Sequence, residues 1–154
     1  MKLFLLRHAQ SEANKRKLAD ARIDSILSKK GKSQSKKLIK ILSKNKYDII
    51  IISPLKRTLQ TIKPFLGSIK KPKIEVSKMI PERNLGDFTG TRLGTFQKYC
   101  RKNKLNAIST RPKNGESVLD VCERAKKFLK YLNKKYKDKS VLICGHRAFL
   151  FCLE

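Results

Sequence analysis

The chain has 154 residues and a mass of 17.7 kDa, the usual size of one domain, so we expect a single domain over residues 1–154. Its residues are 40% hydrophobic and 32% charged, which excludes a disordered tail and fits a soluble protein with one core. With 38 Lys and Arg against 12 Asp and Glu, the net charge of +26 favours anionic ligands and disfavours cationic substrates.

The first half of the chain alternates between apolar runs and helical patterns. Leu3–Leu6 and the isoleucines of Asp48–Ile52 form continuous apolar runs, which are typical of strands covered on both faces, as in parallel sheets. Between them, Gly31–Leu42 carries apolar residues at helical spacing among lysines, which predicts an amphipathic helix. Ser53, followed by proline, favours a helix start with Ser53 as the N-cap, and that helix would reach Gly67.

The second half continues the alternation. Lys73–Ser77 alternates in polarity and predicts a more exposed strand, and Leu93–Arg101 is a candidate for a short helix. Ser117 and Asp120 fit a capping box that opens a long amphipathic helix. A last apolar run predicts a buried strand at Ser140–Cys144. This order predicts an α/β fold, a three-layer α/β/α sandwich around a mostly parallel central sheet.

The N-terminal apolar run is too short for a signal peptide, because Arg7 and His8 follow it directly. No segment approaches the ~20 apolar residues of a membrane span, so we expect a cytoplasmic protein with no membrane partner. The four cysteines show no C-x-x-C pair and no clustered spacing: Cys100, Cys122, Cys144 and Cys152. In a chain without an export signal, this pattern predicts free thiols rather than disulfides.

The only two histidines, His8 and His146, each follow a predicted buried strand, and Arg57 comes shortly after a third. In open α/β sheets the ligand lies beyond the carboxyl ends of the strands, so we expect these three side chains to converge on one pocket. Arg57 would lie in the first turn of a helix, where the macrodipole disfavours a cation by ~0.3–1 kcal/mol. An anion beside Arg57 would explain that position, and chance among 38 basic residues is the alternative.

Five motifs occur in a fixed order over nearly the whole chain. They are Leu6–Asn14 with its Arg-His pair, Ser53–Thr61 with its arginine, the acid loop Pro81–Gly90, the helix start Asn114–Ser117, and Gly145-His146. Together they resemble the motifs of the histidine phosphatase superfamily, the phosphoglycerate-mutase-like enzymes. The resemblance implies a phosphomonoester hydrolase that acts through a phosphohistidine and needs no cofactor and no metal.

The resemblance also implies the catalytic roles. His8 would attack phosphorus as a neutral imidazole, and Glu82 would protonate the leaving alcohol and then accept a proton from water. A protonated His146 would donate a hydrogen bond to the phosphoryl oxygens in the transition state. Without the resemblance, Glu82 is equally well explained as an ordinary ion-pair partner on the surface.

The substrate-binding residues implied by the resemblance are Arg7, Asn14 and Arg57. The two guanidinium groups would hold the phosphoryl oxygens through forked, charge-assisted hydrogen bonds. Asn14 would add a further contact, and a role as a turn or cap residue is the alternative for it.

Three features depart from the family pattern. Ala9 stands where glycine is usual after the first Arg-His, and its methyl group would crowd the loop or require a helical backbone angle. Arg147 stands where glycine is usual after the second histidine, and would either bind phosphate or point outward. The chain ends at Glu154, soon after His146, so we expect a short final helix.

The stretch from Gly90 to Gly115 is short for a mutase of this family, which favours a compact phosphatase. Seven basic residues lie within Thr91–Lys113 and suggest a small, multiply anionic phosphorylated substrate: Arg92, Lys98, Arg101, Lys102, Lys104, Arg111 and Lys113. Phosphoglycerate-mutase-type transfer is the alternative reaction.

Two other classes of function are open. A metal site would use His8, His146 and either Glu82 or Cys144, but the neighbouring arginines would repel a cation. A basic protein that binds nucleic acid without catalysis would use the net charge of +26, although no DNA-reading motif is present. We expect non-specific binding of polyanions as a secondary property, and the sequence does not indicate an oligomeric state.

Overall fold

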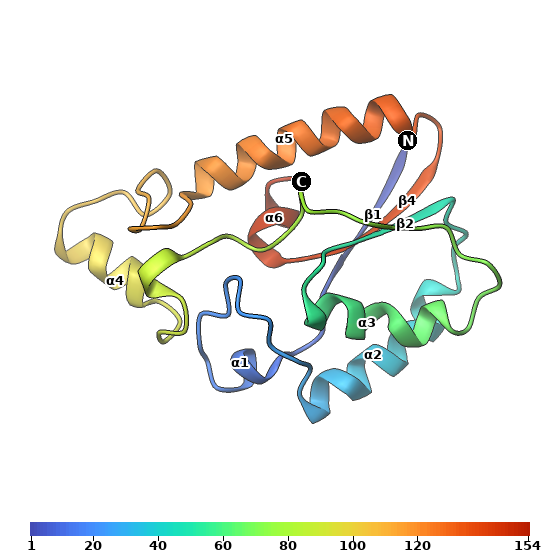
Figure 1. Ribbon diagram of the computed structural model, residues 1–154, viewed down its shortest axis with the longest axis horizontal. Coiled ribbons are helices and arrows are strands. Elements are labelled where there is room, and N and C mark those ends of the chain that lie inside the picture. Colours follow the sequence, from blue (N-terminus) through green and yellow to red (C-terminus); the bar gives the residue numbers. More distant parts are fainter.

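The computed structural model describes residues 1–154 and shows a central sheet of parallel strands between two layers of helices (Figure 1). The strand order is β1-β4-β2-β3. The strands are β1 Lys2–Arg7, β2 Ile49–Ile52, β3 Ile74–Val76 and β4 Ser140–Gly145. All four predicted strands are present, and the predicted parallel sheet is confirmed.

Six α-helices and one 3₁₀ turn connect and cover the strands. They are α1 Glu12–Lys15, α2 Lys29–Leu42, α3 Lys56–Leu66, α4 Thr95–Lys102, α5 Val118–Lys135 and α6 Arg147–Phe151, with the 3₁₀ turn at Gly86–Phe88. The sequence pattern did not predict α1, which is a single turn. None of the helices has the length and hydrophobicity that a membrane span requires.

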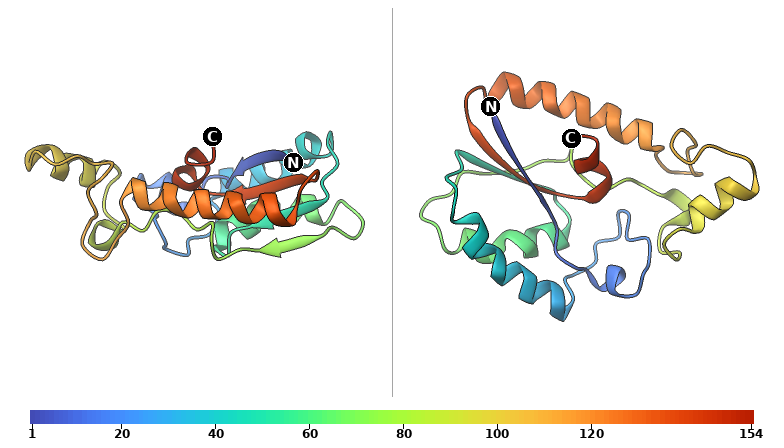
Figure 2. Two further views of the ribbon diagram at one scale, coloured as in Figure 1. Left: turned by 90° about the horizontal axis from the view of Figure 1, so that it is seen from above. Right: turned by 180° about the vertical axis from the view of Figure 1, so that it is seen from behind.

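The β2 strand shows why its isoleucine run is continuous. Ile49 and Ile51 pack in the cluster that contains the buried face of α5 and residues of α6. Ile50 and Ile52 pack on the opposite face, with residues of α2 and α3. The sheet is therefore covered on both sides, which confirms the predicted α/β/α sandwich, and the right view of Figure 2 shows α5 on one side of the strands with α2 and α3 on the other.

The two predicted helix starts have different outcomes. At α5 the capping box is present, with the Ser117 hydroxyl accepting from Asp120 N and the Asp120 side chain accepting from Ser117 N. At α3 the prediction is wrong, because the helix starts later and Leu55 is its N-cap without a side-chain bond. Ser53 is fully buried and its hydroxyl turns toward another strand end.

The prediction of four free thiols is also wrong. Cys122 in α5 and Cys152 at the end of α6 form a disulfide, with their Cα atoms 4.8 Å apart. Cys100 and Cys144 are free and buried. The two bonded cysteines lie 30 residues apart in the sequence, and only the packing of α6 on α5 brings them together, so their spacing gave no signal.

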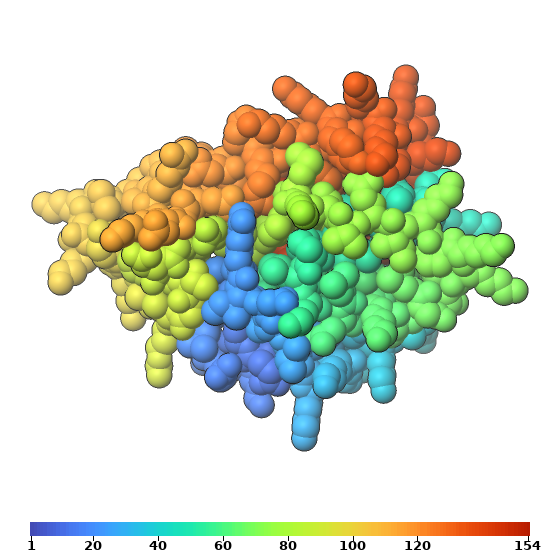
Figure 3. All heavy atoms as spheres, in the orientation of Figure 1, coloured from blue at the N-terminus to red at the C-terminus, as the bar shows by residue number.

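The segment around α4 forms an arm at one end of the molecule, away from the sheet (Figures 1 and 3). Phe96 and Cys100 are its buried residues, and Phe96 packs against Phe88 with ring centroids 5.1 Å apart. The basic residues of Thr91–Lys113 therefore lie on a peripheral part of the fold.

Candidate active site

Three parallel strands end at one edge of the sheet and deliver three polar side chains. His8 follows β1, Ser53 follows β2, and His146 follows β4 directly. The rings of His8 and His146 lie with their centroids 5.2 Å apart, and both residues are buried. The parallel register thus brings together two histidines that are far apart in the sequence.

His8 is held in one tautomer by a backbone contact. Its Nδ1 lies 2.8 Å from the carbonyl oxygen of Ala9, and because a carbonyl only accepts, Nδ1 carries the proton. The lone pair is then on Nε2. Burial is the main cause that lowers the pKa of His8 from 6.5 to about 4, and the charges of Arg57 and Arg7 add to it. His8 is therefore neutral at pH 7.

The loop after His8 is fixed by α3. The Ala9 backbone N–H donates to Thr61 Oγ1 at 2.9 Å, and the Thr61 hydroxyl donates to the Arg57 carbonyl at 2.6 Å. Ala9 is not among the residues with positive φ, so its methyl group causes no backbone strain at this position. The departure from glycine is accommodated by ordinary backbone geometry.

His146 is oriented by one contact on each ring nitrogen. Arg57 Nη2 lies 3.3 Å from Nδ1, and a guanidinium can only donate, so Nδ1 accepts. Nε2 then carries the proton and donates to Ser53 Oγ at 2.7 Å. Burial, followed by the Arg57 and His8 charges, holds the pKa of His146 well below its usual range. Protonation of His146 beside a bound phosphoryl group stays a prediction.

Ser53 is a site residue that the sequence reasoning missed. It was assigned as a helix cap, yet its hydroxyl accepts from His146 inside the site. The available signal was its position, because Ser53 directly follows a buried strand, as the two histidines do.

The Arg57 guanidinium lies beside a carboxylate of the protein itself, that of Asp20. The side chain is fully buried in α3, and its Nη1 lies 3.6 Å from Asp20 Oδ1. Its two terminal nitrogens donate to the carbonyls of Ile23 at 2.6 Å and Ala21 at 2.7 Å. The predicted fork toward phosphoryl oxygens is thus directed at the loop that follows α1, and Nε is the guanidinium nitrogen without a protein partner.

Asp20 is the second residue that the sequence reasoning missed. It is buried, and its Oδ2 accepts from the hydroxyls of Ser11 at 2.6 Å and Ser25 at 2.9 Å. Its Oδ1 accepts no hydrogen bond and faces Arg57. No local pattern around Asp20 distinguishes it from the other acidic residues, since its role arises from a contact across 37 positions of the chain.

Glu82 reaches the site from the acid loop. Its Oε1 accepts from the backbone N–H of Arg83 at 2.9 Å and of Ala148, in α6, at 3.1 Å. Burial raises the pKa of Glu82, and these hydrogen bonds and the nearby charges of Arg57 and Arg7 oppose that effect. A carboxyl group with a raised pKa is suited to donate and accept a proton near neutral pH.

The start of α5 supports the acid loop. Glu116 Oε2 accepts from Asn84 N at 2.9 Å, and Glu116 N donates to Asn84 O at 2.8 Å. A Cβ at Gly115 would lie 2.8 Å from Asn84 O, so only glycine allows this approach. The Asn114–Ser117 motif therefore positions the acid loop rather than entering the site.

A cavity of about 570 Å³ opens beside His8. Arg7 and Asn14 line it together with residues of α2 and Leu93. Asn14 forms a capping box with Ser11 in α1, so the interpretation of Asn14 as a cap residue is correct, and it still borders the cavity. Of the basic segment Thr91–Lys113, only Leu93 lines this cavity, so the lysines and arginines of that segment do not face His8.

The family model of the histidine phosphatase superfamily (branch 1) matches residues 3–153. The chain belongs to this superfamily. Phosphoryl transfer through a histidine is the mechanism of the family, and the structure places two histidines side by side at the strand ends.

Individual relatives agree with this assignment. Phosphoserine phosphatase 1 of Hydrogenobacter thermophilus is 33% identical over 152 residues, which cover 95% of this chain and 71% of that protein. A 2,3-bisphosphoglycerate-dependent phosphoglycerate mutase of Bartonella henselae is 28% identical over 99% of this chain and 81% of the mutase. The mycobacterial glucosyl-3-phosphoglycerate phosphatase in complex with VO3 has the same fold, with a TM-score of 0.83 and 24% identity over 97% of this chain and 77% of that one.

Two remaining residues of this histidine phosphatase have clear positions. Arg147 is exposed at the start of α6 and makes no side-chain hydrogen bond or ion pair, which favours the outward orientation of the two that the sequence left open. Cys144 is buried and its Sγ approaches the Thr58 carbonyl at 3.6 Å. No group of three or more His, Cys, Asp or Glu side chains is arranged to hold a metal ion.

Proposed function

We propose that this histidine phosphatase hydrolyses small phosphomonoesters through a phosphohistidine on His8. The observation that carries the proposal is the state of His8, which is a neutral ring with its Nδ1 proton fixed on Ala9 O and its Nε2 lone pair free. A neutral imidazole is a nucleophile at pH 7, and a covalent intermediate divides the displacement into two easier steps.

In the first step, His8 Nε2 forms a bond to phosphorus while the bond from phosphorus to the ester oxygen breaks. Glu82 gives its proton to that oxygen, and the alcohol leaves. In the second step, water attacks the phosphohistidine, Glu82 takes the proton from the water, and the N–P bond breaks to release inorganic phosphate. The raised pKa of Glu82 supports both proton transfers.

The transferred phosphoryl group needs donors around its equatorial oxygens. Arg7 and Asn14 border the cavity beside His8 and would bind two of these oxygens. Arg57 would contribute its unpartnered Nε, and His146 would donate to a further oxygen once its ring is protonated. We assign catalysis to His8, Glu82 and His146, and the other three residues to substrate binding.

The substrate class that we propose is a small phosphorylated metabolite with more than one negative charge. The names of the relatives support it, since they include enzymes for phosphoserine and phosphoglycerate. The net charge of +26 also favours such anions over neutral esters. A comparison of kcat/KM for monophosphorylated and bisphosphorylated substrates at low and high salt tests this part, and equal values for both classes would contradict it.

Phosphoglycerate-mutase-type transfer is the second candidate, supported by the mutase relative at 28% identity. In that reaction the phosphohistidine would return its phosphoryl group to an alcohol instead of water. Product analysis separates the two, because a phosphatase releases inorganic phosphate in proportion to substrate consumed. Non-specific binding of polyanions remains a proposal for the basic surface, and it should weaken steeply with added salt.

The decisive experiment traps the intermediate. Brief incubation with a labelled phosphoester should give a protein-bound phosphate that is labile in acid and stable in base. The variant His8→Ala should lose both the label and the hydrolysis of an aryl phosphate while it stays folded. Lys127→Ala, an exposed change on α5, is the matched control and should keep both. Full activity of His8→Ala would refute the proposal.

A further inference from the structure

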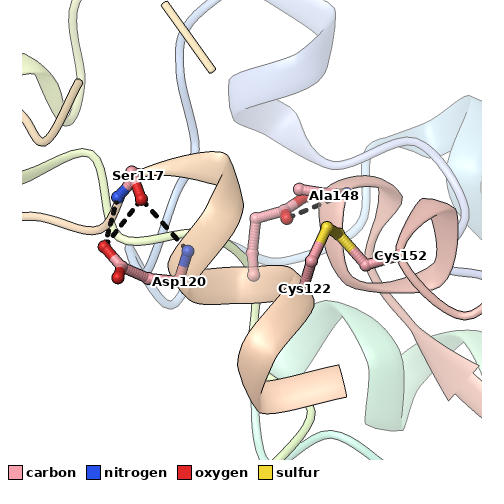
Figure 4. Close-up of a disulfide and its surroundings, with 6 residues drawn as sticks. Ser117, Asp120, Cys122, Ala148 and Cys152 are labelled. Atoms are coloured by element: carbon pink, nitrogen blue, oxygen red, sulfur yellow. Dashed lines mark hydrogen bonds between the residues drawn. A yellow bond between two sulfur atoms is a disulfide. The ribbon is translucent and has the colours of Figure 1, made fainter. Parts of the chain in front are cut away.

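The disulfide between Cys122 and Cys152 links helix α5 to helix α6. It joins the second turn of α5 to the C-cap of α6, as Figure 4 shows. The proposed catalytic mechanism does not use either cysteine. The disulfide matters because α6, which it holds, contributes two groups to the site.

The short helix α6 holds two parts of the site. His146 is its N-cap, and Ala148 in its first turn donates its backbone N–H to Glu82 Oε1 at 3.1 Å. Figure 4 shows Ala148 on the same short helix that ends at Cys152. A movement of α6 would therefore change the surroundings of both the proposed proton donor and the second histidine.

A helix of five residues does not keep its position without packing. On its buried side, Phe149 meets Phe128 of α5 with ring centroids 5.6 Å apart, and the guanidinium of Arg124 lies 5.2 Å from the Phe149 ring. At its C-terminal end, the bond from Cys152 to Cys122 is the covalent link between the two helices. The disulfide thus fixes the end of α6 opposite to the site.

The same interface reaches the acid loop from α5. Arg124 Nη1 donates to the carbonyl of Pro81 at 3.0 Å, next to Glu82. The charges of Arg57 and Arg7 lower the pKa of Glu82 against the effect of burial. The charge of Glu82 in turn raises the pKa of Arg124 against the effect of burial. The contact between α5 and α6 therefore sets the position of Glu82 from two sides.

The bonded pair is also the accessible sulfur of the molecule. Cys122 and Cys152 are half-buried, whereas Cys100 and Cys144 are buried. Burial raises the pKa of Cys144 to about 12, so its thiol is unreactive at neutral pH. A dithiol reagent in solution would react at the Cys122–Cys152 bond first.

We propose that Cys122 and Cys152 form a thiol–disulfide exchange site through which a dithiol reductant loosens α6 and lowers the activity. One thiolate of the reductant attacks a sulfur of the pair, and a mixed disulfide forms as the Cys122–Cys152 bond breaks. The second thiol of the reductant displaces the remaining cysteine. Two electrons and two protons reach the protein, which ends with two thiols, while the reductant becomes a disulfide. This regulation rests on the proposed phosphatase function.

The test compares the oxidised protein with the same protein treated with a dithiol. Thiol titration of the folded protein should show two additional reactive thiols after treatment. The kcat for an aryl phosphate should fall roughly two- to tenfold, the range expected for loss of one hydrogen bond, and should recover on reoxidation. The double variant Cys122→Ser/Cys152→Ser should match the reduced protein and should not respond to the dithiol.

Two readouts separate positioning from a general loss of structure. Loss of the Ala148 hydrogen bond removes a contact that lowers the pKa of Glu82, so the alkaline limb of kcat/KM should move to higher pH on reduction. The chain has only two histidines, so the ring proton resonances of His8 and His146 can be followed by NMR, and that of His146 should shift.

Several outcomes would overturn the proposal. Unchanged kcat, unchanged pH profile and unchanged histidine resonances after full reduction would each contradict it, and so would four titratable thiols before any reductant is added. If neither form hydrolyses phosphoesters, the proposed function fails. The shift of the His146 resonance would still decide whether the disulfide controls the position of α6. If the double variant does not fold, the reduced native chain provides the same comparison.

Discussion

The hydrogen bond between Ser53 and His146 makes a quantitative prediction. Both residues are fully buried, and Oγ lies 2.7 Å from Nε2. Because Arg57 already occupies Nδ1, the change Ser53→Ala leaves the Nε2–H of His146 as a buried donor without an acceptor. An unsatisfied buried group costs about 1–3 kcal/mol of the free energy of unfolding. For a chain of this size, each kcal/mol lowers Tm by roughly 2–4 °C.

Thermal and urea unfolding measure this loss, and Ser68→Ala is the matched control. The Ser68 hydroxyl donates to the Phe65 carbonyl at 2.7 Å, but Ser68 is exposed at the end of α3. Loss of this hydroxyl should therefore change the free energy of unfolding by no more than about 0.5 kcal/mol. We also expect a lower kcat for Ser53→Ala, because His146 loses one of the two contacts that orient its ring. Equal stabilities of the two variants, together with an unchanged His146 NMR resonance, would refute the reasoning.

Three further predictions concern other parts of the site. The pKa of His8 is lowered from 6.5 to about 4, so between these pH values the unfolded chain binds a proton that the folded His8 does not. The contribution of His8 to the free energy of unfolding should therefore fall by about 1.4 kcal/mol for each pH unit through this range. In urea unfolding at pH 7 and at pH 5, the variant His8→Gln should lose less free energy of unfolding between the two pH values than the native chain loses. The variant Glu82→Gln should lower kcat on alkyl phosphates by about 10²–10⁴-fold. Its effect on a nitrophenyl phosphate should be smaller, because that leaving group needs no proton, and equal effects would contradict the role of Glu82. A Cβ at Gly31 would lie 2.0 Å from the Gln10 carbonyl, so Gly31→Ala should push α2 from the loop after His8 and cost about 1–3 kcal/mol. Gly67→Ala is its control, since the nearest atom lies at 3.7 Å, and equal losses would exclude the clash.

The strands and the meeting of the histidines could be predicted because both follow from local sequence. The isoleucines of β2 form a continuous run because helices cover both faces of the sheet. That covering can be recognised in the sequence from the four residues of the strand alone. Parallel strands then bring every residue that follows a strand to one edge. This rule placed His8 beside His146 without any knowledge of side-chain contacts.

Side-chain partners could not be predicted in this way, because they depend on packing between distant elements. Ser53 and its proline fit a helix start, but α3 begins at Lys56, and the hydroxyl of Ser53 turns to β4 instead. Arg57 was expected beside an anion, and Asp20 is such an anion within the chain. The pairing of Cys122 with Cys152 likewise depends on how α6 packs on α5.

The state of His146 links these contacts to the reaction. Burial, followed by the facing Arg57 guanidinium, lowers the pKa of His146 and disfavours a second positive charge there. The carboxylate of Asp20 lies by Arg57 rather than by His146, so it does not compensate a charged ring. A phosphoryl dianion between the two histidines would supply the missing opposite charge and would raise the pKa of His146. We therefore expect protonation of His146 to accompany substrate binding, and we expect binding and protonation to strengthen each other.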